Sequence, residues 1–225
     1  MRTALVLATM LLLSACQPDE APLAPAAAIQ PATTAVVADV RPRVVCLGDS
    51  LTAGFGLPEA EAWPELLQQR LEQKGLAFRV VNASTSGATS AGGLRKVEWL
   101  CREPVHTLIL ALGANDGLRG LSTAATRDNL VAIIRQFRNS SPKVNILLAG
   151  MEVPPSMGAE FSAEFRNVFS NLAKDEKIEL CPFLLKNVGG YPEMNQADGI
   201  HPNSQGQKLL LDNLWPHLES LLKPI

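Results

Sequence analysis

Short apolar runs alternate with amphipathic stretches along most of this sequence. The apolar runs predict buried strands, and the stretches whose apolar residues recur at helical spacing predict helices. Near-continuous apolar strands are typical of a parallel sheet covered on both faces, so we expect an α/β fold with helices on both sides of the sheet. Strands are predicted over residues 44–47, 77–81, 106–112, 143–148 and 178–181, and helices over 61–73, 92–101, 123–137, 161–174 and 204–222.

The N-terminus has the pattern of a bacterial secretory signal over residues 1–15, with a positive start, an apolar segment and small residues at its end. The four residues Leu13-Ser14-Ala15-Cys16, at the end of this signal and directly after it, resemble a lipobox, which predicts cleavage before Cys16 and lipidation of that cysteine. The alternative is an ordinary signal peptide whose final region contains a cysteine. No apolar run reaches the roughly 18 residues that a membrane-spanning helix needs.

Residues 16–42 are rich in Ala and Pro, which predicts a disordered tether between the lipidated cysteine and a domain over 43–225. We therefore expect a protein of the bacterial cell envelope that faces the periplasm and binds the membrane through the lipid on Cys16. Gln17 is not the Asp that retains some lipoproteins in the inner membrane, so the outer membrane is the expected location.

The net charge indicates which classes of partner to expect. The formal net charge of the 225 residues is -2, without the basic face that nucleic-acid binding usually needs, so no nucleic-acid partner is expected.

If Cys16 is lipidated, Cys46, Cys101 and Cys181 remain, and Cys101 with Cys181 is the pairing considered for a disulfide. No spacing indicates a metal site, and no cofactor is expected.

The first predicted strand stops abruptly at Gly48-Asp49-Ser50. Sites in open α/β sheets lie at the carboxyl ends of the strands, so Ser50 is a candidate nucleophile. The alternative is that Ser50 only caps a following helix, since Ser and Asp are favoured caps. The choice depends on whether a base and an oxyanion hole exist elsewhere in the chain.

A base for Ser50 is available in the segment Asp198-Gly199-Ile200-His201. In one tight turn, residues three apart can face the same way, so Asp198 could orient one imidazole nitrogen of His201 and leave the other for Ser50. The same segment also reads as a plain turn before a helix. Both interpretations can hold together.

Donors for an oxyanion hole are predicted at three strand ends. They are the backbone N–H of Ser50, the backbone N–H of Gly87, where no side chain obstructs a substrate, and the side-chain amide of Asn115. An Asn after a strand is usually a turn residue. Here it joins a Ser, a Gly and an Asp-x-x-His at successive strand ends.

These blocks, taken in order, resemble those of the GDSL/SGNH hydrolase superfamily, and in particular its bacterial secreted arylesterase and thioesterase/lysophospholipase branch. The resemblance implies a three-layer α/β/α, flavodoxin-like sheet of about five strands. It also implies Ser50 as nucleophile, Asp198 and His201 as the other catalytic residues, and Ser50, Gly87 and Asn115 as the oxyanion hole. Relatives commonly have an acidic residue after the second-block glycine, whereas this chain has Ala88.

The expected function is hydrolysis of short- to medium-chain carboxylic esters, with thioesters and lysophospholipids as further candidate substrates. An apolar loop that contains Val153, Pro154 and Pro155 is a candidate acyl pocket, although it could instead pack on the core. The competing functions are a carbohydrate or peptidoglycan O-acetylesterase and a non-catalytic envelope lipoprotein. The natural substrate and the oligomeric state stay open at this point.

Overall fold

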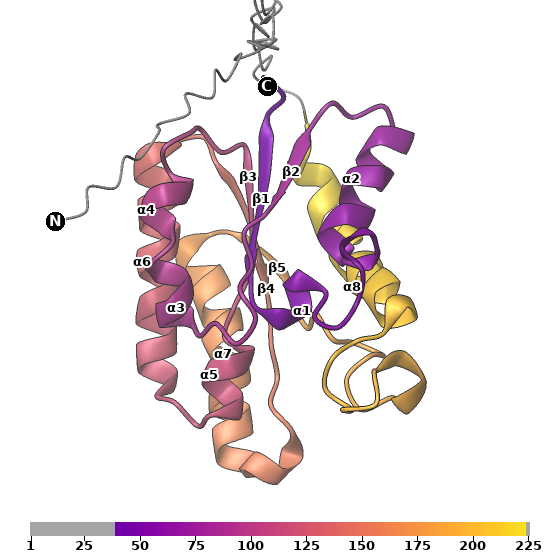
Figure 1. Ribbon diagram of the computed structural model, residues 1–225. Coiled ribbons are helices and arrows are strands. Elements are labelled where there is room, and N and C mark those ends of the chain that lie inside the picture. Colours follow the sequence, from indigo (N-terminus) through magenta and orange to yellow (C-terminus); the bar gives the residue numbers. More distant parts are fainter. Residues whose placement is uncertain (1–38, 224–225) are drawn as a thin grey trace, which may run out of the picture. The chain divides into compact units, whose positions relative to one another are not determined.

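The computed structural model describes residues 39–223, and within them the chain forms one five-stranded parallel sheet (Figure 1). Its order is β2-β1-β3-β4-β5, the arrangement of flavodoxin-like folds, so the expected fold class is confirmed. The predicted signal peptide, Cys16 and most of the predicted tether lie outside the described residues. The strands are β1 Arg43–Gly48, β2 Arg79–Asn82, β3 Thr107–Ala111, β4 Asn145–Ala149 and β5 Glu179–Cys181.

Strand β1 occupies the centre of the sheet because its side chains are apolar and buried on both faces. The residues Val44 to Leu47 are all 0% exposed. The strand pairs with β2 on one side and β3 on the other, and Gly48 lies beside Ala111. The register therefore ends β1 and β3 at the same level, so the loops that follow them leave the same edge of the sheet.

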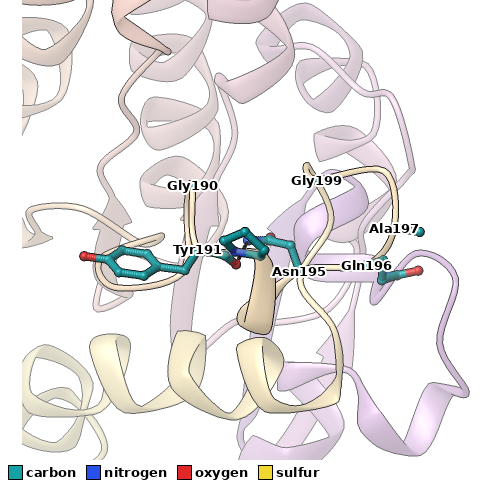
Figure 2. A pocket seen from close by; sticks show the side chains of 7 residues that line it. Gly190, Tyr191, Asn195, Gln196, Ala197 and Gly199 are labelled. Carbon is teal, nitrogen blue, oxygen red and sulfur yellow. Dashed lines mark hydrogen bonds between the residues drawn. The ribbon is translucent and has the colours of Figure 1, made fainter.

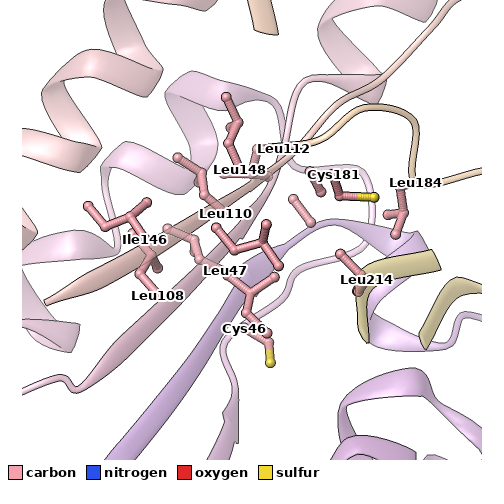
Figure 3. Packing of buried hydrophobic residues seen from close by; sticks show 14 of the residues in the cluster. Cys46, Leu47, Leu108, Leu110, Leu112, Ile146, Leu148, Cys181, Leu184 and Leu214 are labelled. Carbon is pink, nitrogen blue, oxygen red and sulfur yellow. The ribbon is translucent and has the colours of Figure 1, made fainter. Parts of the chain in front are cut away.

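Two layers of helices cover the sheet (Figure 1). Helices α3, α4, α6 and α7 lie on one face, and α2 and α8 lie on the other. Each long helix turns an apolar stripe inward, as with Leu130, Ile134 and Phe137 of α6. Figure 3 shows part of the resulting core. The helices are α1 Ser50–Ala53, α2 Trp63–Gln73, α3 Ser90–Leu94, α4 Val97–Leu100, α5 Ala114–Leu118, α6 Thr123–Ser140, α7 Ala159–Glu176 and α8 Ser204–Leu218.

Three helical regions differ from the sequence prediction. The short helices α1 and α5, which begin directly after β1 and β3, were not predicted, because four or five residues are too few to show a helical period. The single helix predicted over 92–101 is two short ones, Ser90–Leu94 and Val97–Leu100, separated by a turn at Arg95 and Lys96. The last helix ends at Leu218, and a 3-10 turn, Glu219–Leu221, replaces its predicted final turn.

The pairing of Cys101 with Cys181 is not present, and both thiols are free. The Sγ atom of Cys101 faces α6, 3.8 Å from the carbonyl of Gln136, whereas that of Cys181 faces α8, 3.5 Å from the carbonyl of Asn213. These helices lie on opposite faces of the sheet (Figure 1). The pairing is wrong because sequence spacing does not show which layer a cysteine faces.

No helix of the described residues has the length and apolarity to cross a bilayer.

Candidate active site

Ser50 is placed at the carboxyl edge of the sheet by a tight strand-to-helix turn. Asp49 caps α1, and its Oδ1 accepts the N–H of Leu51 at 3.0 Å. The turn folds so closely onto β1 that a Cβ at Gly48 would lie 2.5 Å from the Cβ of Thr52 and 3.1 Å from the carbonyl oxygen of Ala111. Glycine is required there because any larger residue would displace the nucleophile's helix. The turn leaves Ser50 partly exposed.

His201 and Asp198 reach Ser50 from the far end of the chain. The Nε2 atom of His201 lies 3.0 Å from the Oγ atom of Ser50, and its Nδ1 atom lies 2.7 Å from Oδ2 of Asp198. The other oxygen of Asp198 accepts the backbone N–H groups of Ile200 at 2.9 Å and His201 at 3.0 Å. The turn is made possible by Gly199, whose φ is +69°. The structure therefore brings together the three residues that the sequence singled out.

These contacts also set the charge of Asp198. The backbone N–H of His201, the His201 side chain and the backbone N–H of Ile200 lower the pKa of Asp198 to about 2. An ionised Asp198 accepts a hydrogen bond from Nδ1 of His201, so Nε2 is left as the acceptor for the hydroxyl of Ser50. That is the tautomer a general base needs.

Asn115 follows β3 at the start of α5, beside the nucleophile's turn. Its Nδ2 atom donates to Oδ2 of Asp49 at 3.2 Å. The Asp49 carboxyl is fully buried, and this burial raises its pKa to about 6, although the hydrogen bonds from Leu51 and Asn115 act in the opposite direction. The partner of His201 is Asp198, whereas Asp49 uses its two oxygens to accept from Leu51 and Asn115. It links the nucleophile's turn to the Asn115 amide.

Gly87 lies in an exposed loop after β2, with a φ of +77°. The N–H of Thr85 donates to the carbonyl of Gly48 at 3.0 Å, and Nη2 of Arg119 donates to the carbonyl of Gly87 at 3.1 Å. Within residues 39–223, neither the N–H of Ser50 nor that of Gly87 donates to another group of the chain. Both are therefore available to a ligand, as an oxyanion hole requires.

Asp116 holds the loop that contains Gly87 at its far end, where the loop leads into Ser90. Its carboxylate accepts the N–H of Ser90 at 2.8 Å, the hydroxyl of Ser90 at 2.5 Å and the hydroxyl of Thr126 at 3.3 Å. Asp116 is 2% exposed. This carboxylate is used in holding loops together and is not placed to orient His201.

The predicted acyl-pocket loop divides into two parts. Val153 is 8% exposed, and it packs with Phe165 around Gly117, where an added Cβ would lie 2.4 Å from Val153 and 2.8 Å from Phe165. Val153 is therefore part of the core. Pro154 and Pro155 are exposed and remain available to a substrate.

A cavity of about 290 Å³ lies in the loop that leads to Asp198 (Figure 2). Asn195 fixes the shape of this loop, because its Nδ2 atom donates to the carbonyls of Val188 at 2.6 Å and Tyr191 at 2.8 Å. Neither Ser50 nor His201 lines the cavity. The sequence did not indicate it, because residues 184–200 show no strand or helix pattern. The lining residues are Gly190, Tyr191, Pro192, Asn195, Gln196, Ala197 and Gly199.

Two residues near the base were missed from the sequence. The ring of Phe55 packs on the imidazole of His201, with centroids 4.6 Å apart and planes inclined by 41°. The Nε2 atom of Gln196 donates to the carbonyls of Phe55 at 2.6 Å and Pro202 at 3.0 Å. The available signal was an aromatic residue between two glycines directly after the Gly-Asp-Ser turn.

At the carboxyl edge of the parallel sheet, hydrogen bonds join a serine to a histidine and the histidine to an aspartate. This arrangement defines the class of the protein as a serine hydrolase. Comparison with known proteins supports the same class. The sequence model of the GDSL-like Lipase/Acylhydrolase family matches residues 46–209. The chain belongs to this family, as expected from its sequence blocks.

Three similar proteins are named enzymes of ester or thioester hydrolysis. Esterase TesA of Pseudomonas aeruginosa is 44% identical over 180 residues, which cover 80% of this chain and 89% of TesA. The arylesterase of Vibrio mimicus is 36% identical, over 73% of this chain and 82% of its own. Thioesterase 1/protease 1/lysophospholipase L1 of Escherichia coli K12 is 35% identical, over 80% and 84%. A crystal structure of TesA has a TM-score of 0.76 at 42% identity and covers 80% of this chain and 99% of its own.

Proposed function

We propose that this protein hydrolyses carboxylic esters through an acyl-enzyme on Ser50. The observation that carries the proposal is the hydrogen-bonded chain from Asp198 to His201 at 2.7 Å and from His201 to Ser50 at 3.0 Å. The esterase names of the similar proteins support the same reaction class. The N-cap of α1 is Asp49 and not Ser50, so the hydroxyl of Ser50 is not used in capping and is free to act as the nucleophile.

In the first half of the reaction, the Oγ atom of Ser50 attacks the acyl carbonyl while Nε2 of His201 takes its proton. Ionised Asp198 stabilises the imidazolium that forms. The N–H groups of Ser50 and Gly87 and the amide of Asn115 hold the oxyanion. The tetrahedral intermediate then collapses, His201 gives the proton to the leaving oxygen, and the alcohol departs.

In the second half, water takes the place of the alcohol. Nε2 of His201 removes a proton from the water as it attacks the acyl-enzyme, and the same donors hold the second oxyanion. Collapse releases the carboxylic acid and returns the proton to Ser50. Each side chain therefore acts twice, and no cofactor enters any step.

The test uses p-nitrophenyl butyrate turnover and labelling by a fluorophosphonate. Ser50→Ala should lose both while its thermal unfolding midpoint stays that of the wild type. Ser170→Ala is the matched control, because Ser170 is exposed on α7 and its hydroxyl bonds only within that helix, to the carbonyl of Asn167 at 3.3 Å. Full turnover by purified Ser50→Ala would contradict the proposed mechanism. An unlabelled, inactive wild type would instead favour a non-catalytic envelope protein.

Short- to medium-chain esters are the proposed substrates, because the rim of the site carries exposed apolar side chains. Leu118 is 47% exposed, Leu121 is 42% and Ile200 is 55%. Such a rim fits an apolar acyl or alkyl group better than a sugar. Thioesters and lysophospholipids carry the same acyl group and belong to the test panel. Deacetylation of acetylated sugars, with no activity on longer chains, would favour the carbohydrate or peptidoglycan O-acetylesterase.

We further propose that the protein is a periplasm-facing lipoprotein of the cell envelope, anchored through Cys16, with the outer membrane as its location. The lipobox-like residues 13–16 and the absence of Asp at position 17 support this proposal. Incorporation of labelled palmitate in cells should require Cys16, and Cys16→Ser should release the protein from the membrane fraction. Equal membrane recovery of the Cys16→Ser variant would contradict the anchor.

A further inference from the structure

Phe55 has an unusual position for a large apolar residue. Its side chain is 49% exposed, yet its backbone is fixed at both ends. The N–H of Phe55 donates to the carbonyl of Ser50 at 3.1 Å, and its carbonyl accepts from Gln196 at 2.6 Å. Gly54 and Gly56, on either side, have φ values of +67° and +80°, which L side chains rarely adopt. The local fold therefore holds an aromatic ring partly in solvent at a defined place.

That place is beside the base. The ring of Phe55 lies 4.6 Å from the imidazole of His201, centroid to centroid. Gln196 maintains this relationship because it bonds both the Phe55 carbonyl and the Pro202 carbonyl, directly after His201. Its side chain also fills the space where a Cβ at Gly56 would lie, 2.3 Å from its Oε1 atom. The contacts of Gln196 therefore couple movement of the loop that carries His201 to movement of the Phe55 ring.

The chemistry of acylation puts the leaving group next to this ring. His201 protonates the leaving oxygen from Nε2, so that oxygen must come within about 3 Å of Nε2. The atoms attached to the oxygen then lie against the imidazole and the adjoining exposed surface of Phe55. Aromatic rings in offset or tilted contact attract each other beyond their simple burial of area.

We propose that Phe55 forms the wall of the leaving-group subsite and gives the site a preference for esters of aromatic alcohols. The inference rests on the proposed function and adds the residue that distinguishes aromatic from aliphatic alcohols at the site. It assigns to Phe55 a contact with substrate during acylation alone. The acyl-enzyme that remains after the alcohol leaves no longer contains a group for the ring to recognise.

The experiment compares phenyl butyrate with cyclohexyl butyrate, which share an acyl group and have leaving groups of similar size. Phe55→Leu keeps apolar cover on His201 but removes the aromatic ring, and Phe55→Trp keeps an aromatic ring. Phe55→Leu should lower the phenyl-to-cyclohexyl ratio of kcat/KM by about three- to ten-fold, and Phe55→Trp should preserve it. Because each ratio is compared with that of the wild type, the higher intrinsic reactivity of phenyl esters cancels.

Trp99→Leu is the matched control, since Trp99 is 62% exposed on α4, away from the edge of the sheet that carries Ser50 (Figure 1). Hydrolysis of the butyryl-enzyme and the pH profile of kcat/KM should be unchanged in Phe55→Leu. An unaltered ester ratio in Phe55→Leu would overturn the inference. So would an equal loss on both esters with a shifted pH profile, because Phe55 would then only hold His201 in place. A wild type that hydrolyses neither ester would refute the proposed function itself.

Discussion

Asn115 donates its side-chain N–H to a buried carboxylate of Asp49, with 3.2 Å between Nδ2 and Oδ2. Asp49, the residue before the nucleophile, thus sets the rotation of the Asn115 amide, which follows the neighbouring strand β3. An amide nitrogen has two hydrogens, so Asn115 can donate one to Asp49 and the other to an oxyanion. Preorganisation of this kind is what makes an oxyanion donor effective.

We expect Asp49→Asn to lower kcat by at least tenfold, because one carboxylate oxygen becomes an NH₂ group, which only donates. The single remaining oxygen cannot replace both acceptors, Oδ1 for Leu51 and Oδ2 for Asn115. Asn115→Ala should lower kcat by roughly 10² to 10³. Kinetics with p-nitrophenyl butyrate measure both. Asp128→Asn, which removes an exposed charge from α6, is the control for a change of net charge. Wild-type kcat in Asp49→Asn would show that the Asp49–Asn115 bond has no functional role.

The same variant has a predicted effect on stability that depends on pH. The pKa of Asp49 is about 6 in the folded protein and 3.8 ordinarily, so the folded state binds this proton more tightly. The contribution of Asp49 to the free energy of unfolding therefore falls as pH rises from about 4 to 6 and stays low above that. The difference is at most about 3 kcal/mol. Urea unfolding of Asp49→Asn at pH 8 should show no large loss of stability, and a strong loss would contradict this.

Gly87→Ala and Gly75→Ala form a matched pair. Both glycines have a positive φ, +77° and +69°, and a Cβ at either meets little, with Arg119 3.8 Å from Gly87 and nothing within 4 Å of Gly75. Each alanine should cost about 1 to 2 kcal/mol of stability from backbone strain. Only Gly87→Ala should also lose activity, by tenfold or more, since relief of the strain turns its N–H away. Equal activities at equal stability would exclude Gly87 from the oxyanion hole.

Asp198→Asn should lower kcat by about 10³ to 10⁴, because an amide in place of the carboxylate favours the wrong tautomer of His201. The depressed pKa of Asp198, about 2, has a further consequence. Its contribution to stability is present above the ordinary value of 3.8 and is lost as pH falls through 2. Any loss of wild-type activity between pH 4 and 7 therefore has a source other than Asp198. A pH–rate profile of the wild type checks this, and a residual activity above one tenth in Asp198→Asn would contradict its orienting role.

The exposed prolines after β4 give a prediction about acyl-chain length. Pro155→Asp places a charge beside the apolar rim without touching the buried Val153. The kcat/KM for p-nitrophenyl octanoate should fall by tenfold or more relative to that for the acetate. Pro182→Asp, after β5, is a control for loss of a loop proline. An unchanged chain-length profile would remove Pro155 from the acyl pocket.

The sequence was most informative where two independent patterns coincide. An apolar strand that stops at Gly48-Asp49-Ser50 indicates both a core position and a site, and the three-residue spacing from Asp198 to His201 indicates that the two can meet within one turn. Features that depend on contacts between distant residues could not be predicted in this way. Gln196 and Phe55 are 141 residues apart, and nothing local shows that they meet. For the same reason, the Cys101–Cys181 pairing was wrong.

The direction of β1 has a consequence for where substrate comes from. The described chain enters the domain just before Arg43 and reaches Ser50 only after the whole strand (Figure 1). Six residues at about 3.3 Å each separate the two points by roughly 20 Å. The start of the described domain therefore lies at the edge of the sheet opposite the catalytic edge. A substrate can therefore approach Ser50 at the catalytic edge without passing the point where the described chain enters the sheet.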